Sequence, residues 1–168
     1  MPPHRLLLVR HAEAAGGPVD AERTLTPRGE RHAAAIGSWL AGAGLVPDRV
    51  VLSPARRTVQ TWERARAALE RAAGPVVDAR VYGATVEDLL GVVRETAEDV
   101  ATLVVVGHNP SVGELAGLLD DGRGDLALRR EVQGGFRPGQ VAVFTVGTAF
   151  AELVPGTATL EDVAVPGD

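Results

Sequence analysis

Short apolar runs typical of strands alternate with helical patterns along the chain. The strand-like runs span 5–10, 50–52, 76–77 and 102–106, and the helical patterns span 26–42, 53–73, 86–93 and 109–119. This alternation predicts a three-layer α/β sandwich, with a mostly parallel, doubly wound sheet and helices on both faces. Near the end, 141–146 and 149–154 resemble a closing pair of strands joined by a Gly147-Thr148 turn.

Three of the predicted helices begin with the same device, a polar residue followed by proline. The pairs are Thr26-Pro27, Ser53-Pro54 and Asn109-Pro110. A short polar side chain caps the first free N–H groups of a helix, and proline suits the first helical position. We therefore expect Thr26, Ser53 and Asn109 to be N-caps.

The length of 168 residues favours one domain over 1–168 with a sizeable core, and the Pro/Gly-broken tail after about 156 is expected to fray. Cysteine is absent, which excludes disulfides, thiolate metal sites and a thiolate nucleophile. The apolar runs are too short to span a membrane and no signal-peptide pattern is present, so we expect a cytoplasmic protein without a membrane partner. The net charge of −5 argues against a nucleic-acid partner, and it means that an anionic substrate needs a local positive pocket.

Three segments with histidine, arginine or serine side chains that could bind or react with a substrate follow three of the predicted strands. They are Arg10-His11-Ala12, the segment from Ser53 to Thr61, and Gly107-His108-Asn109-Pro110. In doubly wound folds ligands bind at the carboxyl ends of the strands, so these segments are expected to meet at one edge of the sheet.

Together these residues suit phosphoryl transfer. Guanidinium groups, here Arg10 and Arg57, are planar forks for phosphate oxygens, and His108 could donate a further hydrogen bond. A neutral imidazole, here His11, can attack phosphorus. Ser53 and Asn109 add candidate substrate contacts beside helix starts, where free N–H groups favour anions. The scheme needs no metal and no cofactor, and no Gly-x-x-x-x-Gly-Lys loop for nucleotides is present.

The same residues resemble the histidine phosphatase superfamily, whose fold is phosphoglycerate-mutase-like. Arg10-His11-Ala12 is similar to its Arg-His-Gly hallmark, Leu25-Thr26-Pro27-Arg28-Gly29 to its Leu-Thr-x-x-Gly segment, and Ser53–Thr61 to its Ser-x-x-x-Arg-Ala/Thr-x-Gln-Thr segment. Gly107-His108-Asn109-Pro110 is similar to its second-histidine segment. The short length resembles the SixA-like branch, whose members act on phosphohistidine in signalling proteins.

The resemblance implies that His11 forms a covalent phosphohistidine and that Arg10, Arg57 and His108 complete the phosphate pocket. Arg57, not Arg56, stands at the family's position. Ala12 replaces the usual glycine, a mild change where φ stays negative. The family's larger enzymes place a glutamate where this chain reads Arg80-Val81-Tyr82-Gly83, so the candidate general acids are the following Glu87 and Asp88.

The missing glutamate bears on the substrate. Loss of a general acid costs an alkoxide leaving group roughly 10²–10⁴ in rate. An imidazole leaves more readily, which favours a phosphohistidine on a protein as the substrate. Two other functions stay open: a phosphomonoesterase or mutase acting on a small phosphorylated metabolite, and a non-catalytic phosphate-binding module. A metal hydrolase built on His11 and His108 lacks the usual ligand spacing.

Overall fold

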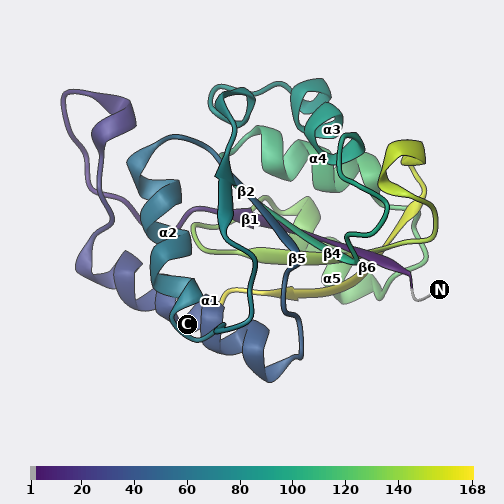
Figure 1. Ribbon diagram of the computed structural model, residues 1–168, viewed down its shortest axis with the longest axis horizontal. Coiled ribbons are helices and arrows are strands. Elements are labelled where there is room, and N and C mark those ends of the chain that lie inside the picture. The colour runs from purple at the N-terminus through teal and green to yellow at the C-terminus, as the bar shows by residue number, and fades with distance from the viewer. Residues whose placement is uncertain (1–2) are drawn as a thin grey trace.

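The computed structural model describes residues 3–168, whose six strands form one sheet with helices on both faces (Figure 1). The strands are β1 (His4–Arg10), β2 (Arg49–Leu52), β3 (Pro75–Val77), β4 (Thr102–Gly107), β5 (Val141–Val146) and β6 (Ala158–Ala164). The α-helices are α1 (Pro27–Gly42), α2 (Arg56–Arg66), α3 (Val86–Arg94), α4 (Ser111–Leu119) and α5 (Leu126–Gln133). Short 3₁₀ turns are η1 (Asp20–Glu22), η2 (Ala79–Val81) and η3 (Phe150–Glu152).

The strand order is β3-β2-β4-β1-β5-β6. The first four strands in this order run parallel, whereas β5 pairs antiparallel with both β1 and β6. The predicted α/β sandwich is confirmed, and its sheet is mixed because the chain closes with an antiparallel pair.

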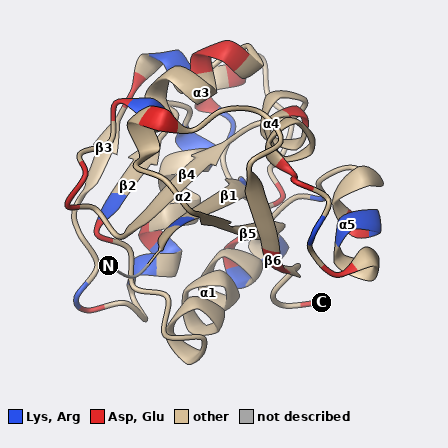
Figure 2. Ribbon diagram, turned by 90° about the vertical axis from the view of Figure 1, so that its right-hand side faces the viewer, with Lys and Arg blue, Asp and Glu red and all other residues tan. Residues whose placement is uncertain are grey.

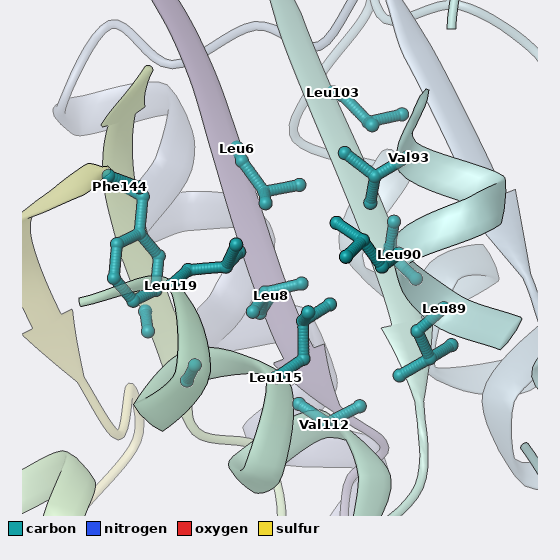
Figure 3. Close-up of a cluster of buried hydrophobic side chains, with 14 of the residues drawn as sticks. Leu6, Leu8, Leu89, Leu90, Val93, Leu103, Val112, Leu115, Leu119 and Phe144 are labelled. Carbon is teal, nitrogen blue, oxygen red and sulfur yellow. The ribbon is translucent and has the colours of Figure 1, made fainter. Parts of the chain in front are cut away.

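Both faces of the central strands β1 and β4 are buried, as parallel strands require, whereas the edge strand β3 is exposed. Leu6 and Leu8 of β1 belong to one core, which α3 and α4 cover, and Figure 3 shows them against Leu115 of α4. Leu7 and Val9 point the other way, into the core under α1 and α2. The uninterrupted apolar run of β1 therefore serves two cores in alternation.

Helix α1 lies directly against α2, and a glycine permits the close approach. A Cβ added at Gly37 would lie 1.9 Å from the carbonyl oxygen of Ala65. At its start, the Thr26 hydroxyl accepts the Gly29 N–H at 2.9 Å, which confirms the predicted cap. Helix α2 also contacts η1, which lies in the β1–α1 connection that projects in purple at the left of Figure 1.

The other two predicted caps are wrong. Helix α2 begins at Arg56 and ends at Arg66, not at about 73, and the Ser53 hydroxyl accepts the N–H of Ala55 within a non-helical turn. Helix α4 begins at Ser111, and the side-chain amide of Asn109 donates to the Phe136 carbonyl instead of capping. Asn109 is thus bound by a tertiary partner, whereas Ser53 closes a local turn that ends before α2 begins.

The end of the chain also differs from expectation. Residues 149–154 do not form a strand, because Phe150 and Leu153 both turn into the core from η3 at a spacing of three. The closing strand is β6, within the tail that was expected to fray. It pairs with β5 and buries Ala158 and Leu160. Helix α5, capped by Asp125, had no counterpart in the sequence-based assignment.

Charged residues of both signs are interspersed over the elements seen in Figure 2. Within residues 3–168, the helices are all too short or too polar to cross a membrane.

Candidate active site

The three chemistry-bearing segments meet at one edge of the sheet. His11 follows β1, Ser53 follows β2 and His108 follows β4. The ladder continues into the loops, because the N–H of His11 donates to Gly107 at 3.1 Å and the N–H of Ser53 donates to Val106 at 3.2 Å. Main-chain hydrogen bonds therefore hold the start of each segment in place.

His11 is a neutral imidazole, and the hydrogen bond of one ring nitrogen fixes its tautomer. Its Nδ1 lies 2.7 Å from the carbonyl oxygen of Ala12, which only accepts, so Nδ1 carries the proton and Nε2 carries the lone pair. Burial, reinforced by the nearby cation Arg57, lowers the pKa of His11 to about 4. At neutral pH the unprotonated Nε2 is available as a nucleophile.

Arg57 lies in the first turn of α2 and is buried, with only 6% of its surface exposed. Its Nε donates to Nε2 of His11 at 3.3 Å, and its Nη2 lies 3.3 Å from Nδ1 of His108. Its Nη1 donates to the Asp20 carbonyl at 2.7 Å. One guanidinium thus contacts both histidines, whereas its neighbour Arg56 is exposed.

His108 faces His11 with the two ring centres 5.3 Å apart. Because Arg57 can only donate, Nδ1 of His108 accepts, and its Nε2–H donates to the Ser53 hydroxyl at 2.8 Å. Burial and the Arg57 charge lower the pKa of His108 to about 4. Ser53 is fully buried, so it orients the His108 ring.

Arg10 and Asn109 share one acceptor. Nη1 of Arg10 and the side-chain amide of Asn109 both donate to the Phe136 carbonyl, each at 2.9 Å. Nε of Arg10 and Oδ1 of Asn109 are buried and have no hydrogen-bond partner. The guanidinium of Arg10 therefore has a buried donor to offer to an anion.

Ala12 adopts an ordinary backbone conformation at the position of the family's glycine. Among the described residues, those with positive φ are all glycines. The N–H of Ala12 donates to the Thr61 hydroxyl at 3.0 Å, and the side chain of Gln60 accepts the N–H of Leu25 at 2.9 Å. Thr61 and Gln60 thus hold the loop that follows His11.

Neither candidate acid joins this group. Asp88 exchanges hydrogen bonds with Thr85 in a capping box, and these bonds lower the pKa of Asp88. Glu87 is exposed on α3. The helix cap accounts for Asp88, and within residues 3–168 neither carboxylate is hydrogen-bonded to the two histidines or to Arg57.

Two further residues of the site, Asp20 and Tyr82, were not among the residues predicted from the sequence. Asp20 accepts from Nη2 of Arg57 at 3.1 Å and from the Tyr82 hydroxyl at 2.5 Å. The Tyr82 ring lies edge-on to His108, with centres 5.6 Å apart. Tyr82 is the only tyrosine and stands where the family's glutamate was sought, a signal that was available in the sequence. Asp20 lies in a long loop without any local pattern.

Within the part of the chain that the structure describes, no three His, Cys, Asp or Glu side chains are close enough together to hold a metal ion.

A family model for the histidine phosphatase superfamily (branch 1) matches residues 6–109, more than half of the chain. The chain belongs to this superfamily. A relative from Mycobacterium tuberculosis, described as an uncharacterized protein, is 34% identical over 94% of this chain and 99% of its own length. The resemblance drawn from the motifs is thereby confirmed.

Among solved structures, this member of the histidine phosphatase superfamily is similar to SixA proteins. One from Nakamurella multipartitia, provisionally named phosphohistidine phosphatase SixA, has a TM-score of 0.83 at 32% identity and covers 100% of this chain and 99% of that one. The protein histidine phosphatase SixA in complex with tungstate has a TM-score of 0.78 at 25% identity over 95% of each chain. The expected phosphoglycerate-mutase-like fold is confirmed.

Proposed function

We propose that this protein is a metal-independent phosphatase that removes the phosphoryl group from phosphohistidine on a protein. The observation that carries the proposal is the fixed tautomer of His11. Its Nδ1–H is given to Ala12, so Nε2 presents a lone pair beside Arg57 and opposite His108.

The reaction has two steps. In the first, the lone pair on Nε2 of His11 forms a bond to phosphorus as the bond to the leaving nitrogen breaks. In the second, water attacks the phosphoryl group on His11 and releases inorganic phosphate. Arg10, Arg57 and a protonated His108 stabilise the negative charge on the phosphoryl oxygens in both steps, and the helix starts after Ser53 and Asn109 flank the pocket.

The proton requirement favours a phosphohistidine over a phosphate ester. The segment 80–83 holds no carboxylate, and Asp88 is engaged as a helix cap. An alkoxide would leave slowly without a proton donor, whereas an imidazole leaves readily as a neutral ring. The likeness to SixA proteins agrees, and one of these was solved with tungstate, a tetrahedral oxyanion like phosphate. A cytoplasmic signalling role goes with such a substrate.

The test is phosphatase profiling of the wild-type protein and of His11→Ala. The panel contains a phosphohistidine protein, an aryl phosphate and small phosphorylated metabolites. We expect hydrolysis of the phosphohistidine protein and the aryl phosphate, unaffected by chelators, and its abolition by His11→Ala. His4→Asn, at the opposite end of β1, is the matched control and keeps activity.

Three results would reject the proposal. Activity that survives in His11→Ala would show that His11 is not the nucleophile. A preference for a phosphorylated metabolite favours the phosphomonoesterase or mutase alternative. Tight phosphate binding without turnover of any substrate favours a non-catalytic module.

A further inference from the structure

The carboxylate of Asp20 is held at the mouth of the pocket by three separate side chains. Its Oδ2 accepts from Nη2 of Arg57 at 3.1 Å and from the Tyr82 hydroxyl at 2.5 Å, and its Oδ1 accepts from Nη1 of Arg23 at 3.1 Å. These donors come from α2, from the turn after η2 and from the same loop as Asp20. A surface carboxylate with three partners from three segments has a fixed position.

That position is beside the reacting groups. Nη2 of Arg57 contacts both Asp20 and Nδ1 of His108, and the Tyr82 ring, which holds Asp20, lies against the His108 ring. Asp20 and Tyr82 therefore adjoin the same corner of the pocket from two different loops. The pair therefore adjoins the place proposed for the phosphoryl group, beside Arg57 and His108.

The Asp20 carboxylate also has free capacity to accept. About half of its side chain, 51%, is exposed, whereas the Arg57 side chain beside it is 7% exposed. The Tyr82 hydroxyl, Arg23 and Arg57 together hold the pKa of Asp20 well below its usual range. Asp20 is thus a permanent anion at neutral pH, able to accept a hydrogen bond but not to donate a proton.

We propose that Asp20 is a specificity-determining residue that accepts a hydrogen bond from the ring N–H of the leaving imidazole, and so selects phosphohistidine over substrates with neutral or anionic leaving groups. This role of Asp20 rests on the proposed function, and it identifies the residue that distinguishes one leaving group from another.

The chemistry follows from the charge of the substrate ring. A phosphorylated imidazole whose second nitrogen is protonated has a cationic ring beside its anionic phosphoryl group, and a carboxylate beside that N–H favours the protonated ring. When His11 attacks, the P–N bond breaks and its electron pair stays on the ring nitrogen. The ring keeps its other proton and leaves as neutral imidazole, so no further proton donor is needed. A leaving group that carries a carboxylate is repelled by Asp20 instead.

Asp20→Asn tests this proposal, because it keeps the size of the side chain and removes the charge. Glu22→Gln is the matched control: it removes one charge from the same η1 turn, at an exposed position. kcat/KM is measured for a phosphohistidine peptide and for p-nitrophenyl phosphate, whose leaving group has no N–H. We expect Asp20→Asn to lower the ratio of the two values about 10-fold to 100-fold, the range of a charge-assisted hydrogen bond. Glu22→Gln should leave the ratio unchanged.

The pH profile supplies a second readout. Removal of the carboxylate lowers the pKa of the bound substrate ring, so the alkaline limb of kcat for the phosphohistidine peptide moves to lower pH in Asp20→Asn. The profile for p-nitrophenyl phosphate keeps its position. A role confined to loop structure would not separate the two profiles.

The other outcomes contradict the proposal. Equal loss on both substrates assigns Asp20 a structural role. If Asp20→Asn raises kcat/KM equally for both substrates and binds inorganic phosphate more tightly, Asp20 competes with the substrate for Arg57 and is displaced when the substrate binds. If the wild type hydrolyses p-nitrophenyl phosphate but not the phosphohistidine peptide, the proposed function itself is wrong. If the wild type hydrolyses both substrates, but Asp20→Asn leaves the ratio of the two kcat/KM values unchanged, only the proposal for Asp20 is wrong.

Discussion

The Nε of Arg57 lies 3.3 Å from Nε2 of His11 and donates to it. The nitrogen proposed to attack phosphorus is therefore paired with the guanidinium proposed to bind the phosphoryl oxygens. In the proposed reaction, a substrate oxygen takes over this N–H, and the same change exposes the lone pair of His11.

Arg57→Lys should lower kcat/KM for an aryl phosphate by about 100-fold or more, because an ammonium is a point charge and cannot contact both histidines as the planar fork does. Arg56→Lys, on the same turn but exposed, is the control and should retain activity. Steady-state kinetics of the two variants checks this. Equal effects at the two positions would contradict the assignment of Arg57.

The two site histidines should titrate near pH 4. Burial disfavours their charged forms and lowers the pKa of each to about 4 from an ordinary value of 6.5. An NMR titration of the imidazole signals, assigned with His11→Asn and His108→Asn, measures both values. Signals that titrate at the ordinary value would show that solvent reaches the rings.

Oxyanion binding should take up a proton at His108. In the free protein its Nδ1 accepts from Arg57, so it can donate to phosphate only after protonation. A bound anion raises the pKa of His108, and affinity then increases as the pH falls from neutral toward 4. Calorimetry of vanadate binding in buffers of different ionisation enthalpy measures the uptake. His108→Asn should abolish it; the same uptake in that variant would place the proton elsewhere.

Gly37→Ala should lower the free energy of unfolding by about 1–3 kcal/mol or more, because its Cβ would meet the Ala65 carbonyl across the α1–α2 contact. Gly42→Ala is the matched control on the same helix. No atom lies within 4 Å of its added Cβ, so stability should be unchanged or slightly higher. Urea denaturation compares the two variants. A Gly37→Ala protein as stable as wild type would mean that the helices separate at little cost.

The sequence predicted the parallel part of the fold well, because there each buried strand is followed by a turn and an amphipathic helix. It failed near the end of the chain. There η3 buries Phe150 and Leu153 from a short turn, and the β6 pattern is interrupted by a register shift opposite Val143 and Phe144. Ser53 and Asn109 carried good local capping signals, but Ser53 closes a turn that precedes α2, and Asn109 donates to the distant Phe136 carbonyl.

The site was predictable where it depends on strand ends and not where it depends on loops. His11, Arg57 and His108 follow regular elements, so their convergence could be foreseen. Asp20 contacts Arg57 and Tyr82, which lie 37 and 62 positions away in the sequence, from an irregular loop. No hydrophobic periodicity in the sequence predicts the conformation of such a loop.

The hydrogen bond from His11 N–H to the Gly107 carbonyl has a consequence for how this site can vary. The two histidines directly follow neighbouring strands, so the pairing of β1 with β4 sets the spacing of their backbones. A slip of one residue between β1 and β4 would shift one ring by about 3.3 Å along the strand and turn it to the other face. Core substitutions that preserve the register leave the distance between nucleophile and partner intact, whereas a single insertion in either strand destroys it.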